Sequence, residues 1–379
     1  MASRKRILWL VSWYPNKYDR YDGDFIQRHA RAAALLDDVQ VIFVKHIAEQ
    51  VNIETEWNRI GALTEQIIYL PKHSTTLGKL RNFQQWHGIY KRAILEYFKD
   101  GYPHVMHVHI PWKAGLLALW VKKKYKLQFI LTEHWGIYND VAEDNIHTKS
   151  FLQRLLLKKI FKEAEAFVSV SKFLGEGVNK TILKKQYAVI PNVVDTELFF
   201  PTGEKQLRFT FLHVSNMVPL KNVEGLILGF HKFLLQTGTD AQLILIGNRD
   251  NSHHKFAAQL QLLDHSVFFK GEMPYEQVAT EMQRSHVFVL NSNIENSPCV
   301  IGEALCCGLP VITTNVGGIP ELVGRENSLL VEAGNTTSLT TAMVQIYQHY
   351  QQYNSSQIGG SAKKMFSFSS VARQIHDLY

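Results

Sequence analysis

The chain has 379 residues, of which 46% are hydrophobic and 20% are charged. The hydrophobic share excludes a largely disordered protein, the charged share is too low for a coiled coil, and the length suggests two domains of about 150 residues each. The formal net charge of +7 is uneven, because residues 1–200 carry 29 basic and 20 acidic side chains, a net +9, whereas residues 201–379 carry 12 and 14. All seven Trp residues also lie in the first half. A basic surface either attracts nucleic acid, anionic lipid or an acidic substrate, or serves only solubility.

The three cysteines, Cys299, Cys306 and Cys307, have neither the spacing of a metal site nor that of a disulfide framework, which favours a reducing compartment. Basic residues at 4–6 precede an apolar stretch, as in a signal peptide. That stretch is short and lacks a small-residue cleavage site, so we expect a buried strand there. No run approaches the roughly 18 apolar residues of a membrane-spanning helix. We expect a cytoplasmic protein whose membrane contact is at most peripheral, at the inner face.

Short runs of β-branched and aromatic residues alternate with amphipathic stretches along the first half. The predicted strands are 6–12, 39–44, 66–70, 104–109, 128–132, 166–170 and 187–190, and the predicted helices are 24–36, 81–99, 113–125, 151–164 and 172–182. This alternation predicts a parallel sheet that is covered by helices on both faces.

The second half repeats the arrangement. Its predicted strands are 208–214, 242–246, 266–269, 286–290 and 310–313, and its predicted helices are 222–236, 253–263, 275–284, 298–307 and 336–352. The fold class is therefore α/β, with two facing Rossmann-like doubly wound domains, 1–190 and 203–362, joined by a linker at 191–202. In such sheets ligands bind at the carboxyl ends of the strands, so a cleft is expected between the two domains.

Candidate site residues follow several of these strands at the point where each strand ends. They are Trp13, His46, His109, His134 and Ser171 in the first half, and Asn216 and Gly247 in the second. A single histidine at a strand end is more often structural than catalytic. Three histidines that converge on one rim are better candidates.

Two glutamates, Glu295 and Glu303, stand eight positions apart, the first in a loop and the second inside the next helix. Pro298 suits the first turn of that helix, so the amides of 296–300 are expected to be unpaired and to attract phosphate or sugar oxygens. At about 1.5 Å rise per residue the two carboxylates are about 10 Å apart. That spacing suits an extended ligand with hydroxyls at both ends and anionic charge between them, and it exceeds the roughly 5–9.5 Å of a glycosidase carboxylate pair. Taken alone, two unrelated surface glutamates would be the simpler interpretation.

Neighbouring residues favour the ligand interpretation. Gly317 and Gly318 follow a predicted strand and precede a predicted helix start. The glycines allow close backbone approach, and the helix adds a second terminus that suits anions. Lys221, after strand 208–214, could place a point charge on a diphosphate.

These motifs occur in a fixed order along the chain. They are GDFI with Arg28 and His29 at 23–29, HVH at 107–109, TEH at 132–134, VSVS at 168–171, IPNVVD at 190–195, Lys221-Asn222, the glutamate pair at 295–303, and GLPVITTNVGGIPELV at 308–323. The ordered set resembles that of retaining GT-B glycosyltransferases of family 4 (glycosyl transferases group 1), which include sucrose synthases and bacterial mannosyltransferases of lipid and polysaccharide assembly.

The resemblance implies a catalytic set. Glu295 would hold the hydroxyls of the transferred sugar, Lys221 would stabilise the departing diphosphate, and His134 would contact the sugar near the reacting centre. The implied donor-binding residues are Glu303 (at the nucleotide ribose), Gly23 (in a loop that closes over the phosphates), Asn216, Asn296, Ser297, Cys299, Val300, Gly317 and Gly318. Trp13, His109 and Trp135 are expected on the acceptor side, where tryptophans offer apolar faces to a sugar or lipid. The alternative is that the tryptophans only fill the core.

The resemblance also implies net retention, no cofactor and no essential metal, with a nucleotide-diphosphate sugar as co-substrate. No pair of carboxylates spaced like D-x-D directly follows a predicted strand, which agrees with the absence of a metal. A terminal helix at about 363–379 would pack back on the first domain. One departure concerns Asn216, which stands where many relatives have arginine beside the diphosphate. Lys221 would then carry more of the leaving-group charge, or Arg249 would substitute.

The expected function is transfer of a hexose-type sugar to a glycan or a lipid-linked acceptor, in the synthesis of cell-surface polysaccharide or glycolipid. The basic first half then suits an anionic glycan or a membrane-bound lipid carrier better than nucleic acid. A nucleotide-sugar epimerase on the same scaffold stays open, as does a catalytically silent nucleotide-sugar-binding relative. A phosphorylase is disfavoured, because the sequence lacks the lysine context that would bind its cofactor. A dehydrogenase is disfavoured, because no G-x-G-x-x-G follows strand 6–12.

Overall fold

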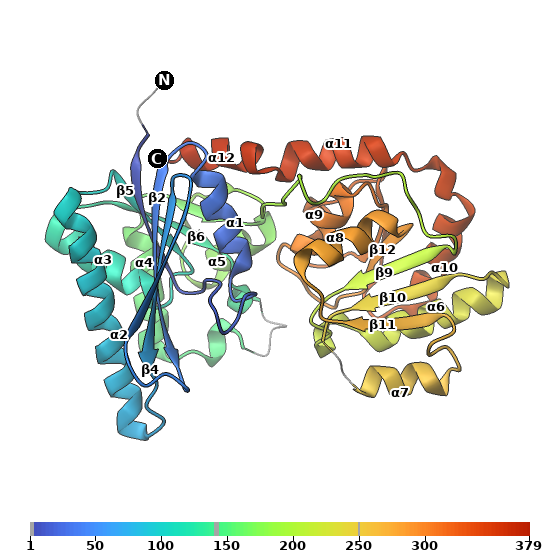
Figure 1. The fold of residues 1–379 in the computed structure, drawn as a ribbon, viewed down its shortest axis with the longest axis horizontal. Helices are drawn as coiled ribbons and strands as arrows, with labels where there is room; N and C mark the ends of the chain where they lie inside the picture. The colour runs from blue at the N-terminus through green and yellow to red at the C-terminus, as the bar shows by residue number, and fades with distance from the viewer. Residues whose placement is uncertain (1–3, 140–143, 249–250) are drawn as a thin grey trace. The chain divides into compact units, whose positions relative to one another are not determined.

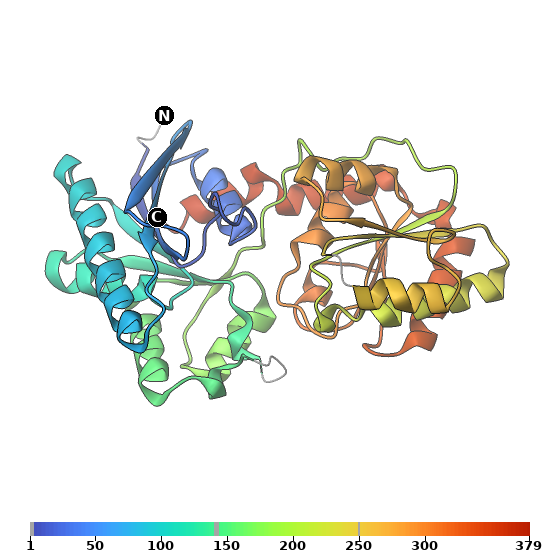
Figure 2. The same cartoon turned by 60° about the horizontal axis from the view of Figure 1, so that its bottom comes forward.

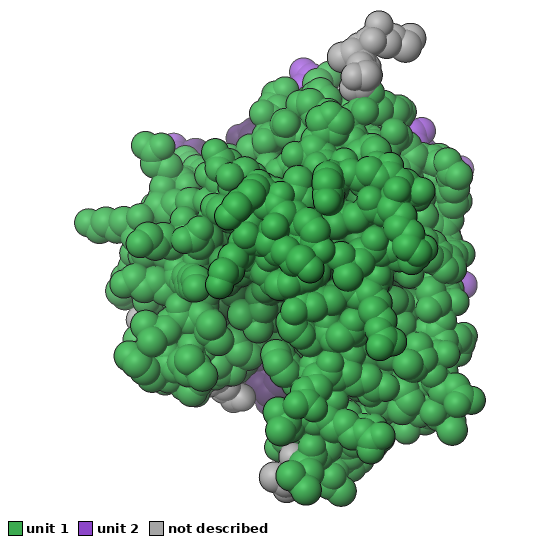
Figure 3. Space-filling view, turned by 90° about the vertical axis from the view of Figure 1, so that its left-hand side faces the viewer, with its two compact units in different colours: residues 1–193, 368–379 green, residues 194–367 purple. Residues whose placement is uncertain are grey.

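The computed structural model describes residues 4–139, 144–248 and 251–379. The chain forms two compact units, coloured separately in Figure 3: unit 1 comprises residues 1–193 and 368–379, and unit 2 comprises residues 194–367. Residues 194–202, predicted as part of a linker, belong to unit 2. The reason is packing, because Val194 and Phe199 are buried in the core of that unit and the Val194 amide donates to the Phe366 carbonyl at 2.9 Å.

Unit 1 is built on an eight-stranded sheet with the order β3-β4-β2-β1-β5-β6-β7-β8. Its strands are β1 (Arg6–Val11), β2 (Asp38–Ile47), β3 (Glu54–Ile60), β4 (Leu63–Pro71), β5 (Val105–His109), β6 (Phe129–Glu133), β7 (Phe167–Ser169) and β8 (Ala188–Val189). All pairings are parallel except that of β3 with β4. Along β1, Leu8 and Leu10 belong to one hydrophobic core, and Ile7, Trp9 and Val11 belong to a second. This alternation confirms a sheet that is buried on both faces.

The sequence analysis missed β3. This edge strand is largely exposed and rich in charged residues, so it lacks the apolar run that identifies a buried strand. It turns back onto β4 through Gly61, whose φ of 60° permits the tight turn.

Helices cover both faces of each sheet (Figures 1 and 2). Those of unit 1 are α1 (Asp24–Ala33), α2 (Thr76–Tyr97), α3 (Ala114–Tyr125), α4 (Phe151–Glu163), α5 (Lys172–Thr181) and α12 (Phe368–His376). The predicted terminal helix at 363–379 is two helices in the structure, because Ser367 is extended (φ −63°, ψ 154°) between α11 (Ser355–Phe366) of unit 2 and α12 of unit 1.

Unit 2 is built on a six-stranded parallel sheet with the order β11-β10-β9-β12-β13-β14. The strands are β9 (Thr210–Val214), β10 (Gln242–Ile246), β11 (Val267–Gly271), β12 (Val287–Leu290), β13 (Val311–Thr314) and β14 (Ser328–Val331). Besides α11, the helices are α6 (Val223–Thr237), α7 (Asn251–Gln259), α8 (Tyr275–Arg284), α9 (Cys299–Cys306) and α10 (Thr336–Gln348). Two α/β units, whose sheets are parallel except for the edge strand β3, confirm the predicted α/β class. Among the described residues, no helix combines the length and the apolar character needed to cross a membrane.

The carboxyl-terminal segment is held to unit 1 by a partly buried hydrogen-bond network. Trp9 Nε1 donates to Tyr379 Oη at 3.0 Å, and His107 Nδ1 lies 2.8 Å from the same oxygen. His376 Nδ1 lies 2.8 Å from the Asp37 carboxylate, and α12 packs against α1. The last helix is therefore part of the core of unit 1 although it follows unit 2 in the chain.

We expect Tyr379→Phe to destabilise unit 1 by about 1–3 kcal/mol, since it leaves buried partners of the hydroxyl unsatisfied. The melting temperature should fall by about 2–4 °C per kcal/mol. Tyr102→Phe is the matched control, because Tyr102 is 59% exposed. Thermal unfolding followed by circular dichroism measures both variants, and equal melting temperatures would contradict the assigned role of the network.

Candidate active site

The strand order of the unit 2 sheet reverses between β9 and β12. These strands are neighbours in the sheet, although β10 and β11 lie between them in the chain (Figure 1). The connections that leave their carboxyl ends then run to opposite sides, and such a point is where doubly wound sheets bind ligands. Two hydrogen bonds join the loops that follow β9 and β12: the Asn293 amide donates to the Leu220 carbonyl at 2.8 Å, and Asn291 Nδ2 donates to the Asn222 carbonyl at 3.2 Å.

Lys221 and Glu295 meet at this point. Lys221 ends a single 3₁₀ turn, Pro219–Lys221, in the loop after β9, and Glu295 lies in the loop after β12. Lys221 Nζ is 2.5 Å from Glu295 Oε1, and the two side chains are 21% and 11% exposed. Ser292 Oγ donates to the same carboxylate oxygen at 2.7 Å. A cation and a carboxylate are thus held together, partly buried, at the position where a ligand is expected.

Gly317 allows the Glu295 loop to lie against the turn that follows β13. Its φ is +56°, and a Cβ built on it would lie 1.8 Å from the Glu295 carbonyl oxygen. The Gly318 amide donates to that same oxygen at 3.1 Å. Both glycines, predicted to contact the donor, therefore have a structural role in positioning the backbone of Glu295.

Glu303 is buried on α9, eight positions after Glu295. Tyr275 Oη, at the start of α8, donates to Glu303 Oε1 at 2.5 Å. The sequence pattern points to Glu303 but not to this partner. Pro274-Tyr275 before a helical pattern was the available signal for a helix start, but nothing in it pointed to Glu303. The other predicted donor residues of this region, Asn296, Ser297, Cys299 and Val300, are all partly exposed in the loop before α9 and its first turn.

The loop after β9 is shaped by a histidine that sequence analysis missed. His213 Nδ1 lies 2.9 Å from the Val289 carbonyl and His213 Nε2 lies 2.7 Å from Ser215 Oγ, which accepts from the Met217 amide at 3.0 Å. Burial lowers the pKa of His213 to about 4, so the ring is neutral and donates from Nδ1. Asn216, between the two anchored residues, is exposed. Arg249, the other candidate for the diphosphate, lies outside the described residues.

Unit 1 brings the predicted residues of the first half together at the carboxyl ends of β1, β5 and β6. His109 Nδ1 and His134 Nε2 are 3.0 Å apart, and Phe25 lies beside His134 with ring centroids 4.9 Å apart. The rings of Trp13 and Trp135 meet edge to face with centroids 5.8 Å apart. Gly23, at φ +69°, caps α1, and a Cβ built on it would lie 2.8 Å from the Trp13 Cβ. Gly23, which was predicted to lie in the phosphate loop, therefore packs directly on Trp13.

Trp13 also lines a cavity of about 320 Å³ at the ends of β1 and β2. Lys45 and Asp22 form an ion pair of 2.7 Å in its wall. His46, a candidate from the sequence, lines the same cavity, and burial, followed by the charge of Lys113, lowers its pKa to about 4. Trp13 is thus both part of the core and part of a polar cavity wall.

Glu133 orients the segment that carries His134 and Trp135. It is buried at the end of β6, and its carboxylate accepts from the His134 amide at 2.9 Å, the Trp135 amide at 2.8 Å and Tyr138 Oη at 2.5 Å. Burial raises the pKa of Glu133 to about 7, although the three hydrogen bonds favour the charged form. Glu133 belongs to the TEH motif at 132–134, but the sequence assigns it no role.

Two family models match successive parts of the chain. Residues 38–198 match Glycosyltransferase Family 4, and residues 194–363 match Glycosyl transferases group 1. The two matches meet close to the boundary between the units, after Val193.

Relatives and solved structures agree with these matches. The putative teichuronic acid biosynthesis glycosyltransferase TuaC of Bacillus subtilis is 24% identical and is covered over 98% of its length by 99% of this chain. N-acetyl-alpha-D-glucosaminyl L-malate synthase of Bacillus anthracis is 26% identical over 64% of this chain and 65% of its own length.

Among solved structures, sucrose-phosphate synthase from Thermosynechococcus elongatus superposes with a TM-score of 0.79 at 19% identity, covering 99% of this chain and 98% of that one. Anabaena Alr3699/HepE, solved with UDP and glucose, has a TM-score of 0.70 at 16% identity, covering 99% of both chains. At such identities the structures establish the fold, which is that of GT-B glycosyltransferases. The two family matches together span residues 38–363, and on this basis the chain belongs to the family 4 (group 1) glycosyltransferases.

Proposed function

We propose that this glycosyltransferase moves a hexose-type sugar, with net retention and without a metal ion, from a nucleotide-diphosphate sugar to a glycan or lipid-linked acceptor in cell-surface polysaccharide or glycolipid synthesis. The observation that carries the proposal is the Lys221–Glu295 pair at the point where the strand order of unit 2 reverses. The name of the full-length relative, a putative enzyme of teichuronic acid biosynthesis, supports an acceptor of the cell surface.

The chemistry needs a positioned cation and a positioned carboxylate. The bond from the anomeric carbon to the donor phosphate breaks, and the diphosphate leaves as an anion that Lys221 stabilises. Glu295 accepts hydrogen bonds from hydroxyls of the transferred sugar, while Ser292 keeps the carboxylate in place. When the diphosphate replaces Glu295 as the partner of Lys221, a carboxylate oxygen of Glu295 becomes available to the sugar.

Retention follows when the acceptor attacks from the face that the diphosphate leaves. The acceptor oxygen bonds to the anomeric carbon, and its proton passes to the departing phosphate oxygen. This route requires neither an enzymic nucleophile nor a general base, so positioning and electrostatic stabilisation supply most of the rate acceleration. Glu303 would bind the nucleotide ribose, His134 the sugar near the reacting centre, and Trp13, His109 and Trp135 would lie on the acceptor side.

A peripheral contact with anionic membrane is supported by helix α4. Its exposed face carries Phe151, Leu152 and Leu155, which are 69%, 65% and 47% exposed. The same helix exposes four cations, Arg154, Lys158, Lys159 and Lys162. Apolar side chains beside basic ones suit an interface of anionic headgroups and acyl chains.

Glu295→Gln and Lys221→Ala should each lower kcat/KM for sugar transfer by about 10²–10³-fold, because each removes a charge that acts on the transition state. Glu281→Gln is the matched control: it breaks an ion pair of the same length, Lys270–Glu281, between β11 and α8. Transfer is measured as release of nucleoside diphosphate with each folded variant. Wild-type turnover in either site variant would refute the assignment.

Nucleotide binding should raise the melting temperature of unit 2. We expect one member of a panel of UDP, GDP and ADP to stabilise the protein by about 2.7 kcal/mol at 100 times its Kd. Lys221→Ala should reduce this shift and Glu281→Gln should preserve it. If no member of the panel changes the wild-type melting temperature, the proposal of a nucleotide-diphosphate sugar as donor is contradicted.

Vesicles that contain anionic lipid should bind the wild-type protein and release it as salt increases, because each Lys or Arg near the surface contributes about 1 kcal/mol. Replacing Phe151 and Leu152 by Ser, or Lys158 and Lys159 by Gln, should weaken binding several-fold in flotation assays. Leu207→Ser, at a fully exposed position of unit 2, is the control. Equal flotation of all these proteins would contradict the proposed contact of α4 with the membrane.

A further inference from the structure

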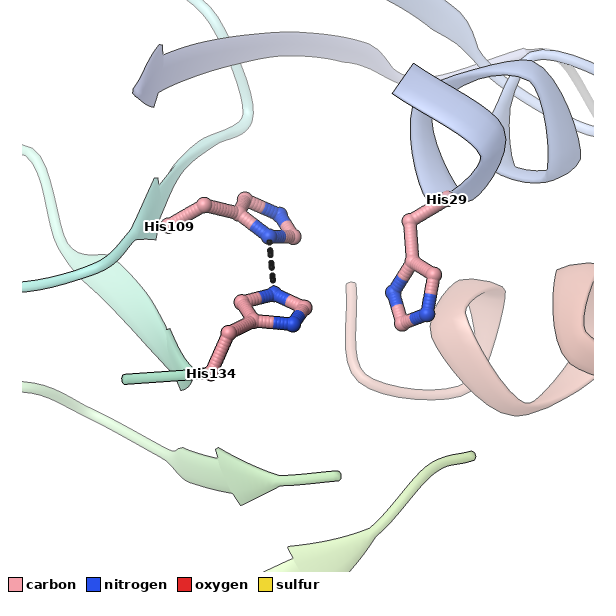
Figure 4. A group of neighbouring side chains, drawn as sticks. All are labelled: His29, His109 and His134. Atoms are coloured by element: carbon pink, nitrogen blue, oxygen red, sulfur yellow. Dashed lines mark hydrogen bonds between the residues drawn. The ribbon is translucent and has the colours of Figure 1, made fainter. Parts of the chain in front are cut away.

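Three histidines of unit 1 come together from separate elements. His29 lies on α1, His109 ends β5 and His134 follows β6, and Figure 4 shows the three rings in one group. Each ring offers a nitrogen that lies within 4.8 Å of the corresponding nitrogens of the other two. Only His109 and His134 are joined by a hydrogen bond in this group, at 3.0 Å.

Two nitrogens of this group are buried and have no hydrogen-bond partner among the described residues: Nε2 of His29 and Nε2 of His109. The side chains of His29, His109 and His134 are only 1%, 0% and 8% exposed. Native interiors seldom leave such atoms unsatisfied, because each costs about 1–3 kcal/mol. Two unsatisfied nitrogens in one histidine cluster indicate a ligand that accepts electron pairs.

The hydrogen bonding of His29 suits such a ligand. A neutral imidazole binds a metal ion through the nitrogen that carries no proton. The His29 ring hydrogen-bonds the backbone of Pro191, which has only a carbonyl to offer, so Nδ1 carries the proton and Nε2 keeps its lone pair.

We propose that His29, His109 and His134 form a binding site for one divalent transition-metal ion, with Zn²⁺ as the best match. Three imidazoles and one open position are a recurrent zinc coordination set, with Zn–N distances of about 2.0–2.1 Å. Among the described residues the cluster offers imidazole nitrogens and no carboxylate, which favours Zn²⁺ over Mg²⁺ and Ca²⁺. Metal binding brings the three ligating nitrogens closer together. The hydrogen bond between His109 and His134 breaks if one of its two nitrogens becomes a metal ligand.

A fourth histidine, His107, lies beside this group but is not part of the proposed metal site. The ring of His107 is 4.3 Å from that of His109, but its two nitrogens are engaged by Tyr379 Oη and Thr132 Oγ1. The positive charge of Arg28 acts on His29 and would repel a metal ion. Arg28 forms an ion pair of 2.9 Å with Asp24, and the negative charge of Asp24 offsets that repulsion. Trp9 stacks on His109 with ring centroids 4.0 Å apart and holds that ring in place.

A bound metal ion would occupy His134, the residue proposed to contact the sugar, so metal loading should inhibit transfer. This consequence rests on the proposed function, whereas metal binding itself does not.

The experiment titrates Co²⁺ into the chelator-treated full chain and records visible absorption, which reports tetrahedral coordination. We expect one Co²⁺ per chain, displaced by Zn²⁺ and not by Mg²⁺. His29→Gln and His134→Gln should each weaken binding by about 100-fold or more, since even partners of the ligands contribute 10–100-fold. His107→Gln is the matched control: it alters a buried neighbouring histidine outside the set and should bind Co²⁺ as the wild type does.

Circular dichroism checks the folding of each variant. If His29→Gln fails to fold, the test rests on His134→Gln, because His134 is the least buried of the three histidines. No visible band in the wild type, or equal affinities in the wild type and the folded site variants, overturns the proposal. Glu295→Gln should bind Co²⁺ normally, because its substitution lies in unit 2. Loss of transfer in that variant and loss of metal binding are therefore distinguishable results.

Discussion

The pairing of Lys221 with Glu295 depends on the neighbouring positions of β9 and β12 in the sheet of unit 2. Those strands lie more than seventy residues apart in the chain, and the reversal of strand order is what brings their loops together. The loops are then fixed by backbone hydrogen bonds, by Ser292, and by the close approach that Gly317 permits. A cation and a carboxylate positioned in this way need little reorganisation when charge develops on a leaving group, which is the property that the proposed transfer uses.

Unit 1 buries many polar groups at the ends of its central strands, and these groups need hydrogen-bond partners. Glu133 is satisfied by two amides and a tyrosine hydroxyl, and His107 by Thr132 and Tyr379. The carboxyl-terminal segment supplies part of this satisfaction, which explains why α12 belongs to unit 1. Against that background the unsatisfied nitrogens of His29 and His109 lie within one cluster of three histidines, and this juxtaposition is the reason for proposing a metal site.

Strands that are buried on both faces are the elements best predicted from the sequence. Strand β10 was predicted at 242–246 and spans Gln242–Ile246, because a short continuous apolar run is typical of a strand that is buried on both faces. Prediction from the sequence failed for β3, whose exposed charged residues carry no such pattern, and for the break at Ser367, which is a local backbone conformation inside a continuous amphipathic pattern. The loop-shaping role of His213 was also missed, since its partners Val289 and Ser215 meet it only across neighbouring strands.

The sequence by itself determined the α/β class, the two-part organisation and the candidate residues, because strand patterns, glycines and the spacing of Glu295 and Glu303 are local properties of the chain. Only the tertiary structure decided which candidates meet. It joined Lys221 to Glu295, gave Glu303 its tyrosine partner, placed Gly317 under the Glu295 backbone, and gathered His29 with His109 and His134. These are contacts between residues distant in the chain. They depend on strand order and on burial, which no local pattern of residues encodes.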